Sequence, residues 1–391
     1  WTLRLIVVAA TFGVVCALAL TAFLPALRGG TPGPAVLVVG ALVALAAVAV
    51  GTQAFSIGMV LTRGGPERVT ETLAGIQYDY AFRMARFGLG AAVAALTGVL
   101  LAALGVAATV LVAASRLRVT LTPARREQGP GAGAFPRDAA SRTRSPAGTA
   151  VAVVALVLVT VVALVCAWPW IAGVLAAPGA PAGGLRAQVN TWVPALVGAL
   201  VSVGVAYLAA LGIGGLRPLG RHSEWLLLLF APWLFTGTGP LSVADWQNVR
   251  DLGLVDSFLA LFPPLLVSVP ALLVLTLLCK GLAGRNDGDF FGRVLMPSLP
   301  MAGILVVAVT LVNAQDALWP LLVAQRPELF TVPVTQMNQL GGFLTTVPDV
   351  GASTPLIAVA LVLAAVVAAQ LLYLDRLAVT VGGSRTAAPG A

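Results

Sequence analysis

Charged residues are scarce in this chain. Only 10% of its 391 residues are Asp, Glu, Lys or Arg, whereas 59% are hydrophobic, and the mean hydropathy is +0.97. Soluble domains carry about 25% charged residues, so a chain of this length with so few charges cannot cover a water-facing surface. The scarcity of charge therefore excludes an ordinary soluble domain and indicates a membrane protein.

Metal-ligating residues are also few. His222 is the only histidine, and Cys16, Cys166 and Cys279 lie far apart, in or beside apolar stretches. A zinc site needs clustered Cys, His or carboxylate ligands. The sequence therefore predicts no metal site, and nothing in it indicates a bound cofactor.

Common catalytic motifs are missing as well. The chain has no G-x-x-x-x-G-K-[ST] phosphate loop, so it is not itself a P-loop ATPase. The G-x-S-x-G and H-E-x-x-H motifs of hydrolases and metalloproteases are also absent. We expect no catalytic residues here.

The net charge of +8 does not indicate a nucleic-acid partner. The basic residues lie between apolar stretches rather than together on one face, and arginine-rich loops are the ordinary topology signal of membrane proteins. The partner that this charge pattern predicts is the lipid bilayer.

Long apolar runs predict an all-α integral membrane protein with about nine transmembrane helices. A helix needs about 20 apolar residues to cross a hydrocarbon core of about 30 Å, and the alternation of a β-barrel is absent. The predicted spans are 3–27, 34–61, 88–115, 149–170, 192–214, 224–238, 256–279, 298–319 and 354–374. The span 224–238 is short, and Pro263, Pro264 and Pro270 predict a kink in the span 256–279.

An arginine-rich segment divides the chain. Residues 116–148 hold seven arginines among Gly, Pro, Ser and Thr, which predicts a flexible cytosolic linker. Three predicted helices (1–115) precede it and six (149–391) follow it, so we expect the linker and the C-terminus on the cytosolic side of the plasma membrane. At the start of the sixth span, Ser223 is interpreted as a helix N-cap and Glu224 as favoured by the helix dipole.

The first part contains a series of short motifs in a fixed order. They are the run from Phe55 to Pro66 (FSIGMVLTRGGP), Thr70-Glu71-Thr72-Leu73, Tyr80-Ala81-Phe82 and Phe87-Gly88. In this order they resemble the C-terminal end of the first permease subunit of maltose-type ABC importers.

The second part resembles the partner permease subunit of the same importers. The matching positions, in order, are Asn190, Ala206-Tyr207, Leu252-Gly253-Leu254, Asn313, Asp316, Trp319-Pro320-Leu321, Pro327-Glu328-Leu329 and Thr331-Val332-Pro333. Together the two resemblances cover about residues 50–115 and 186–385.

The resemblance implies a permease bundle of the type I ABC importers, formed by fusing the end of one permease subunit to a second. It implies import of a small solute, most commonly a carbohydrate, by alternating access. The implied partners are ABC ATPase subunits that hydrolyse ATP, an extracytoplasmic solute-binding protein and a second permease subunit.

A cytosolic loop of these permeases docks on the ATPase, with the pattern E-A-A-x-x-x-G followed by a proline. By resemblance its glycine is Gly284, and Phe290, Phe291, Arg293 and Pro297 belong to the same ATPase-coupling loop. The glycine would permit a turn with positive φ between two short helices, although an ordinary loop glycine is the alternative. The glutamate position holds Leu278 and the two alanine positions hold Cys279 and Lys280, which puts ATP coupling in doubt.

Asn313 and Asp316 are three residues apart, so we expect them on one helix face. Polar groups at membrane depth commonly line a bundle interior or a water-filled path, which indicates a translocation path. The alternative is that Asp316 is hydrated at the outer interface.

Gly64, Gly65, Pro66, Trp319 and Pro320 are expected in outer loops, where the resemblance places the solute-binding protein. The alternatives are a plain connecting turn for the first three and, for Trp319, the interfacial anchor that tryptophan often provides.

Three other functions remain open at this point. The first is a degenerate permease paralogue that does not couple ATP, which Leu278 at the glutamate position favours. The second is a polytopic enzyme acting on a lipid carrier, which would need acidic clusters near the membrane face. The third is an ion-coupled carrier, which would need more buried carboxylates than Asp316.

Overall fold

The computed structural model describes residues 35–55, 58–59, 65, 67, 69, 71–121, 183–284, 289–341 and 377–380, with single positions between 154 and 168 and between 361 and 373. The predicted span 3–27, most of the predicted spans 149–170 and 354–374, and most of the linker 116–148 lie outside these residues.

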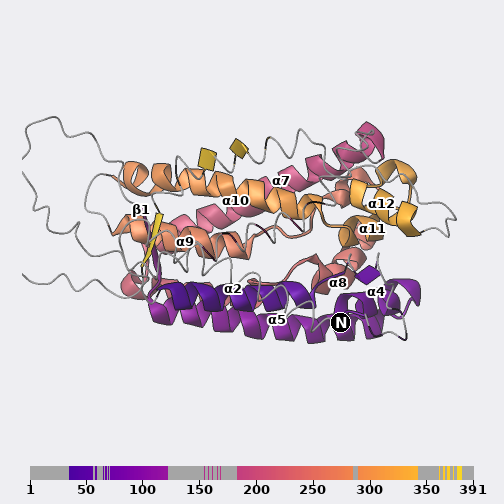
Figure 1. Ribbon diagram of the computed structural model, residues 1–391, viewed down its shortest axis with the longest axis horizontal. Helices are drawn as coiled ribbons and strands as arrows, with labels where there is room; N and C mark the ends of the chain where they lie inside the picture. The colour runs from indigo at the N-terminus through magenta and orange to yellow at the C-terminus, as the bar shows by residue number, and fades with distance from the viewer. Residues whose placement is uncertain are drawn as a thin grey trace, which may run out of the picture.

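Five helices run along the long axis of the molecule (Figure 1). They are α2 (Ala35–Thr52), α5 (Phe87–Ser115), α7 (Gly184–Ala210), α9 (Val269–Ala283) and α10 (Met296–Ala314). Two of them carry π-helical turns, η3 (Leu211–Leu216) after α7 and η7 (Phe291–Leu295) before α10.

Short elements gather at the two ends of this bundle (Figure 1). One end, which we call the α11 end, holds α4 (Leu73–Tyr78), α8 (Thr238–Asp251), α11 (Leu318–Val323) and α12 (Val332–Gly341), and η1 (Asp79–Arg83) follows α4 directly. The other, the β1 end, holds the strands β1 (Arg118–Leu121) and β2 (Leu377–Thr380). The remaining elements are the 3₁₀ helices η4 (Gly220–Leu229), η5 (Ala231–Trp233), η6 (Phe258–Leu261) and η8 (Pro327–Leu329).

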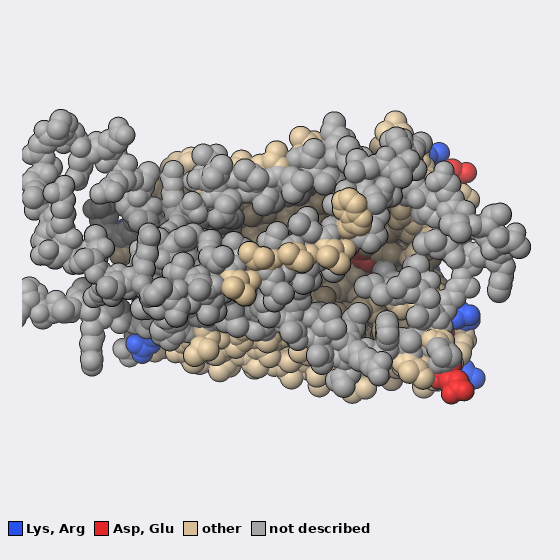
Figure 2. Space-filling view, in the orientation of Figure 1, with Lys and Arg blue, Asp and Glu red and all other residues tan. Residues whose placement is uncertain are grey.

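Among the described residues, three helical segments are long and apolar enough to cross a membrane, namely Phe87–Ser115, Gly184–Leu216 and Phe291–Ala314. They confirm the predicted spans 88–115 and 192–214 as apolar helices, and the predicted span 298–319 as far as Ala314, where α10 ends. They indicate a membrane-embedded protein. In Figure 2 the coloured charged groups lie near the two ends of the long axis, apart from one acidic group inside a recess. This distribution suits a bundle whose middle faces hydrocarbon.

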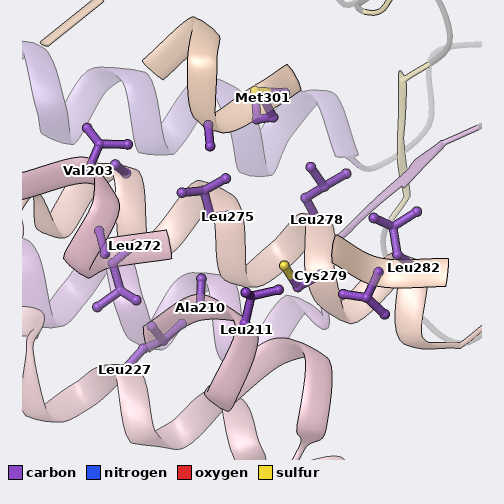
Figure 3. Close-up of a cluster of buried hydrophobic side chains, with 14 of the residues drawn as sticks. Val203, Ala210, Leu211, Leu227, Leu272, Leu275, Leu278, Cys279, Leu282 and Met301 are labelled. Carbon is purple, nitrogen blue, oxygen red and sulfur yellow. The ribbon is translucent and has the colours of Figure 1, made fainter. Parts of the chain in front are cut away.

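The largest hydrophobic core lies between α7, α9 and α10 (Figure 3). Leu272, Leu275, Leu278 and Leu282 of α9 are fully buried in it. Because these leucines recur every three or four residues, they form one stripe on α9, which α7, η3 and α10 cover.

The helices before and after the linker are packed together. Gln53, beyond the end of α2, donates through Nε2 to the Phe235 carbonyl (2.8 Å) and accepts through Oε1 from the Gly237 amide (2.7 Å). Gln77 of α4 donates to the Gly239 carbonyl (2.7 Å). These amide side chains therefore join the two parts of the chain through backbone groups of the segment 235–239.

The segment 220–233 corrects the prediction of an α-helix at 224–238. It is the pair of 3₁₀ helices η4 and η5, which pack beside α5. A 3₁₀ helix rises about 2.0 Å per residue, against 1.5 Å for an α-helix. The short run therefore covers more length than its residue count suggests. Ser223 is not the predicted N-cap either, because it lies within η4 and its Oγ accepts from the Leu219 amide (3.0 Å).

The prolines of the predicted span 256–279 do not kink a helix. Helix α9 begins only at Val269, with Pro270 in its first turn, while residues 262–268 are not helical. Pro263 lies against α7 at Gly198, where an added Cβ would come within 2.8 Å of Pro263 Cδ. The Ser268 amide donates to the Ser202 carbonyl of α7 (3.1 Å). The span is thus discontinuous, and α7 satisfies part of its free backbone.

The all-α prediction needs a small correction at the β1 end. β1 and β2 form an antiparallel pair, with Arg118 opposite Thr380 and Leu121 opposite Leu377. β1 can begin here because Arg116 ends α5 in the left-handed conformation (φ 52°). The pairing places the residues just after α5 and residues 377–380 at the same end of the bundle.

Gly105 should be sensitive to substitution because α5 and η5 touch there. A Cβ at this position would overlap with the Ala231 carbonyl oxygen, whereas a Cβ at Gly98 would meet nothing within 4 Å. We expect Gly105→Ala to lower the free energy of unfolding by about 1–3 kcal/mol, as overpacking does. Thermal unfolding of the purified protein in detergent measures the loss, and Gly98→Ala is the matched control. Equal stability of the two variants would show that α5 and η5 are not in close contact.

Candidate functional site

At the α11 end, Trp319 joins α11 to residues 260–262. We call this region the junction. The Trp319 side chain is only 1% exposed, and its Nε1 donates to the carbonyls of Ala260 (2.8 Å) and Phe262 (3.2 Å). These carbonyls lie where the span 256–279 is not α-helical. The interpretation of Trp319 as an interfacial anchor is therefore wrong. The single indole N–H is shared by two backbone carbonyls that a continuous α-helix would have satisfied itself.

Asp316 lies just before α11, beyond the end of α10. Its Oδ1 accepts from the Leu318 amide (3.0 Å) and its Oδ2 from the Thr238 hydroxyl of α8 (3.0 Å). A short acidic side chain that bonds the backbone two residues on competes with continuation of a helix, and α10 ends at Ala314. The prediction that Asn313 and Asp316 share one helix face is therefore wrong.

Two asparagines tie α7 to its neighbours. Asn313 Nδ2 donates to the Ala195 carbonyl (3.3 Å), and Asn190 Nδ2 donates to the carbonyls of Glu328 (2.9 Å) and Phe330 (3.3 Å). Asn190 is buried, so its amide fixes the loop that follows α11. Pro320 is buried within α11.

Asp256 lies at the solvent-exposed edge of this junction. It has a left-handed backbone conformation (φ 63°), its Oδ1 accepts from the amides of Gln325 (3.0 Å) and Arg326 (2.9 Å), and its Oδ2 pairs with the Arg326 guanidinium. The Arg326 amide is the largest of several influences that hold the pKa of Asp256 below its usual range.

The lowered pKa predicts an acid-sensitive loop. Because the folded-state pKa lies below the unfolded value of about 3.9, the stabilisation is complete above that value and is lost as the pH falls through the folded-state pKa. We expect wild type to lose more of its melting temperature than Asp256→Asn between pH 6 and pH 3. Asp251→Asn, at an exposed pair with Arg250, is the control and should follow wild type. Parallel curves of melting temperature against pH for wild type and Asp256→Asn would contradict a lowered pKa of Asp256 in the folded protein.

The predicted ATPase-coupling segment begins inside the bundle. Leu278 and Cys279 are fully buried and Lys280 is 3% exposed, and Figure 3 shows Leu278 and Cys279 within the core beside Leu275 and Leu282. They belong to α9, which runs without interruption to Ala283. The three positions that correspond to the glutamate and alanines of the motif therefore cannot touch another protein in this conformation.

Gly284 does not have the predicted positive φ. It ends α9 with φ −74°, and the nearest atom to an added Cβ would be the Gly281 carbonyl oxygen at 3.7 Å. The prediction of a glycine-dependent turn is wrong because an ordinary right-handed conformation ends this helix.

The other predicted coupling residues lie at the start of the α10 segment. Phe291 is 52% exposed, whereas Phe290 packs on Gly215, and Arg293 lies in the π turn η7. The Pro297 carbonyl accepts from the Tyr373 hydroxyl (2.7 Å), and the Tyr207 hydroxyl bonds the Leu295 carbonyl (2.9 Å). Two tyrosines thus satisfy backbone carbonyls around a proline-containing helix start.

Of the predicted outer turn, the structure describes Gly65, which lies outside any helix, while Gly64 and Pro66 are outside the described residues. Glu71 is described and lies just before the Thr72 cap of α4.

Two acidic residues, Asp245 and Glu224, lie in partly or largely buried places that the sequence did not predict. Asp245 lies seven residues after Thr238 on α8, hence on the same helix face, and burial raises its pKa. Glu224 Oε2 lies 2.6 Å from Lys280 Nζ in a buried ion pair. Buried charges are seldom left unpaired. An acidic residue within an apolar stretch, such as Glu224, was therefore the sequence signal that could have predicted a buried ion pair.

The described polar side chains of the junction position backbone segments against one another. Within the described ranges no group of His, Cys, Asp and Glu could hold a metal ion, and the polar side chains of the junction bond mainly to backbone. Comparison with protein-family models, curated proteins and solved structures finds no match. The structure therefore defines a membrane-embedded helical bundle with a polar junction at one end.

Proposed function

We propose that this chain is the membrane permease subunit of a sugar-type ABC importer, which moves a small solute, with carbohydrate as the favoured class, into the cytoplasm. The β1 end faces the cytosol in this proposal, and the α11 end faces the solute-binding protein. Separate ATPase subunits bind and hydrolyse ATP. The chain supplies the alternating-access path.

The observation that supports the proposal is that the resemblance residues meet in space. Asn190 bonds the Glu328 carbonyl, and Phe55 and Trp319 belong to one buried cluster. Tyr207 bonds the backbone next to Pro297. Pairs that lie up to 264 positions apart in the numbering would rarely come together if each resemblance had arisen by chance.

Discontinuous helices add support. Transporters form solute sites where helices break at membrane depth, since such backbone is tolerated only when it is buried in protein or lines a cavity. The break at residues 262–268 lies between α7 and Trp319, which meets that condition.

Uptake measurements test the proposal. Cells expressing the chain with its ATPase and binding protein should accumulate labelled mono- or oligosaccharides, and removing the ATPase should abolish accumulation. An Asn190→Ala variant, which releases the loop after α11, should lower uptake at unchanged protein level. Uptake through the chain that is unaffected by loss of the ATPase would refute the proposal.

A non-coupling permease paralogue is the second candidate, favoured by the burial of Leu278 and Cys279. It predicts that the chain copurifies with the importer yet leaves ATP hydrolysis unchanged when solute and binding protein are added. Solute-stimulated ATP hydrolysis by the reconstituted complex would exclude it.

A further inference from the structure

The β1 end contains a buried cation that is already satisfied. Lys280 Nζ lies 2.6 Å from Glu224 Oε2 and donates to the Leu117 carbonyl at 3.0 Å. The side chains of Lys280 and Glu224 are 2% and 12% exposed. This ion pair joins α9, η4 and the turn between α5 and β1, and it engages the Glu224 carboxylate.

Two arginines lie beside the pair. Arg118 directly follows Leu117, whose carbonyl Lys280 binds. Arg217 lies three residues after Gly214, where an added Cβ would come within 3.2 Å of the Lys280 backbone nitrogen. Both guanidinium groups act on the Lys280 ammonium as like charges.

Neither arginine has an acidic partner among the residues the structure describes. Arg118 Nε is buried and makes no hydrogen bond. Among the described residues, Lys280 and the two arginines that act on it therefore bring three cationic groups to a place where Lys280 already occupies the Glu224 carboxylate. A buried donor without an acceptor is costly, and buried polar groups in folded proteins are nearly always bonded to protein, water or an ion. The charge and the free donor together point to an anion with several acceptor oxygens.

The position of the arginines indicates which anion. They lie at the β1 end of the apolar bundle, and the proposal rests on the orientation given under Proposed function, in which phospholipid headgroups of the cytoplasmic leaflet surround this end. Basic pockets between helices at the cytoplasmic face bind anionic headgroups. The planar guanidinium matches phosphate geometry better than an ammonium does. We propose that Arg118 and Arg217 form a binding site for a phosphate group, supplied by an anionic phospholipid headgroup or by free phosphate.

Ligand-induced stabilisation of the full chain tests the site. The protein is purified in a neutral detergent, and its melting temperature is followed by size-exclusion chromatography after heating. Phosphatidylglycerol, phosphatidylcholine and inorganic phosphate are titrated separately. We expect phosphatidylglycerol, inorganic phosphate or both to raise the melting temperature of wild type, whereas phosphatidylcholine does not. The concentration for half the effect should increase about tenfold or more in Arg118→Gln/Arg217→Gln.

A matched variant separates the site from general charge. Arg186 is exposed at the opposite end, in the first turn of α7, so Arg186→Gln removes the same charge and should respond like wild type. If the double variant does not fold, the single variant Arg217→Gln is titrated instead, because Arg217 lies outside the β pair.

A phospholipid headgroup and free phosphate predict different stabilisation results. A response to phosphatidylglycerol alone assigns a lipid headgroup, and a response to inorganic phosphate in lipid-free detergent assigns free phosphate. The proposal is overturned if neither ligand stabilises wild type, or if Arg186→Gln weakens the response as much as the arginine variants do.

Discussion

Replacing Trp319 with alanine should lower the free energy of unfolding by about 3–5 kcal/mol, the range for deleting a buried aromatic side chain. Trp319 is among the largest fully buried side chains of the described residues and packs with Leu261, Leu322 and Val323. Its indole also bonds the carbonyls of Ala260 and Phe262. The substitution opens a cavity and leaves both carbonyls without a donor.

Two further variants separate packing from hydrogen bonding. Trp319→Phe keeps most of the ring but removes the donor, so we expect a smaller loss of about 1–3 kcal/mol. Trp233 is 53% exposed, and Trp233→Ala should change stability by less than about 1 kcal/mol. Unfolding of the purified protein in mixed micelles of increasing denaturing detergent measures all three. A loss for Trp319→Ala no larger than for Trp233→Ala would refute the buried junction.

Replacing Lys280 with methionine should cost about 3–5 kcal/mol, because it leaves the Glu224 carboxylate without its partner in a largely buried place. The reverse change, Glu224→Met, strands the ammonium and should cost a similar amount. The double variant should be more stable than either single variant, since replacing both charges by apolar groups is often neutral. It should remain below wild type, because the Leu117 carbonyl also loses its donor.

A double-mutant cycle measures this coupling directly. The exposed pair Arg250–Asp251, with side chains 52% and 67% exposed, provides the matched control, and Arg250→Met should cost less than about 1 kcal/mol. Strictly additive effects of the Lys280 and Glu224 substitutions would show that the two side chains do not interact.

The long apolar helices could be predicted from composition alone. The predicted span 88–115 differs by one residue from α5 (Phe87–Ser115), and α7 with η3 contains the whole of 192–214. Length and hydropathy suffice for such segments, because a lipid-facing helix satisfies its own backbone and needs no specific neighbour.

The broken segments could not be predicted in this way. The apolar runs 224–238 and 256–279 predicted continuous helices, yet residues 220–233 form 3₁₀ helices beside α5 and residues 262–268 are not helical. Their backbone groups are satisfied by partners far away in the chain, such as Trp319 and Ser202. Hydropathy contains no information about those partners.

The candidate site also has features that could be predicted from the sequence and features that could not. Asn313, Asp316 and Trp319 could be singled out from the sequence, since a polar or indole side chain stands out in such an apolar stretch. Their roles were not predictable, because Asp316 and Trp319 act on α8 and on residues 260–262, which are distant in sequence.

The sequence by itself determined that this protein is helical, membrane-embedded and without common catalytic motifs, because charge scarcity and long apolar runs are local properties. Only the tertiary structure decided which polar groups are buried, that Lys280 pairs with Glu224, and that Leu278 and Cys279 are inaccessible. Burial and pairing depend on which segments pack together, and in a uniformly apolar chain many packings satisfy the same hydropathy pattern.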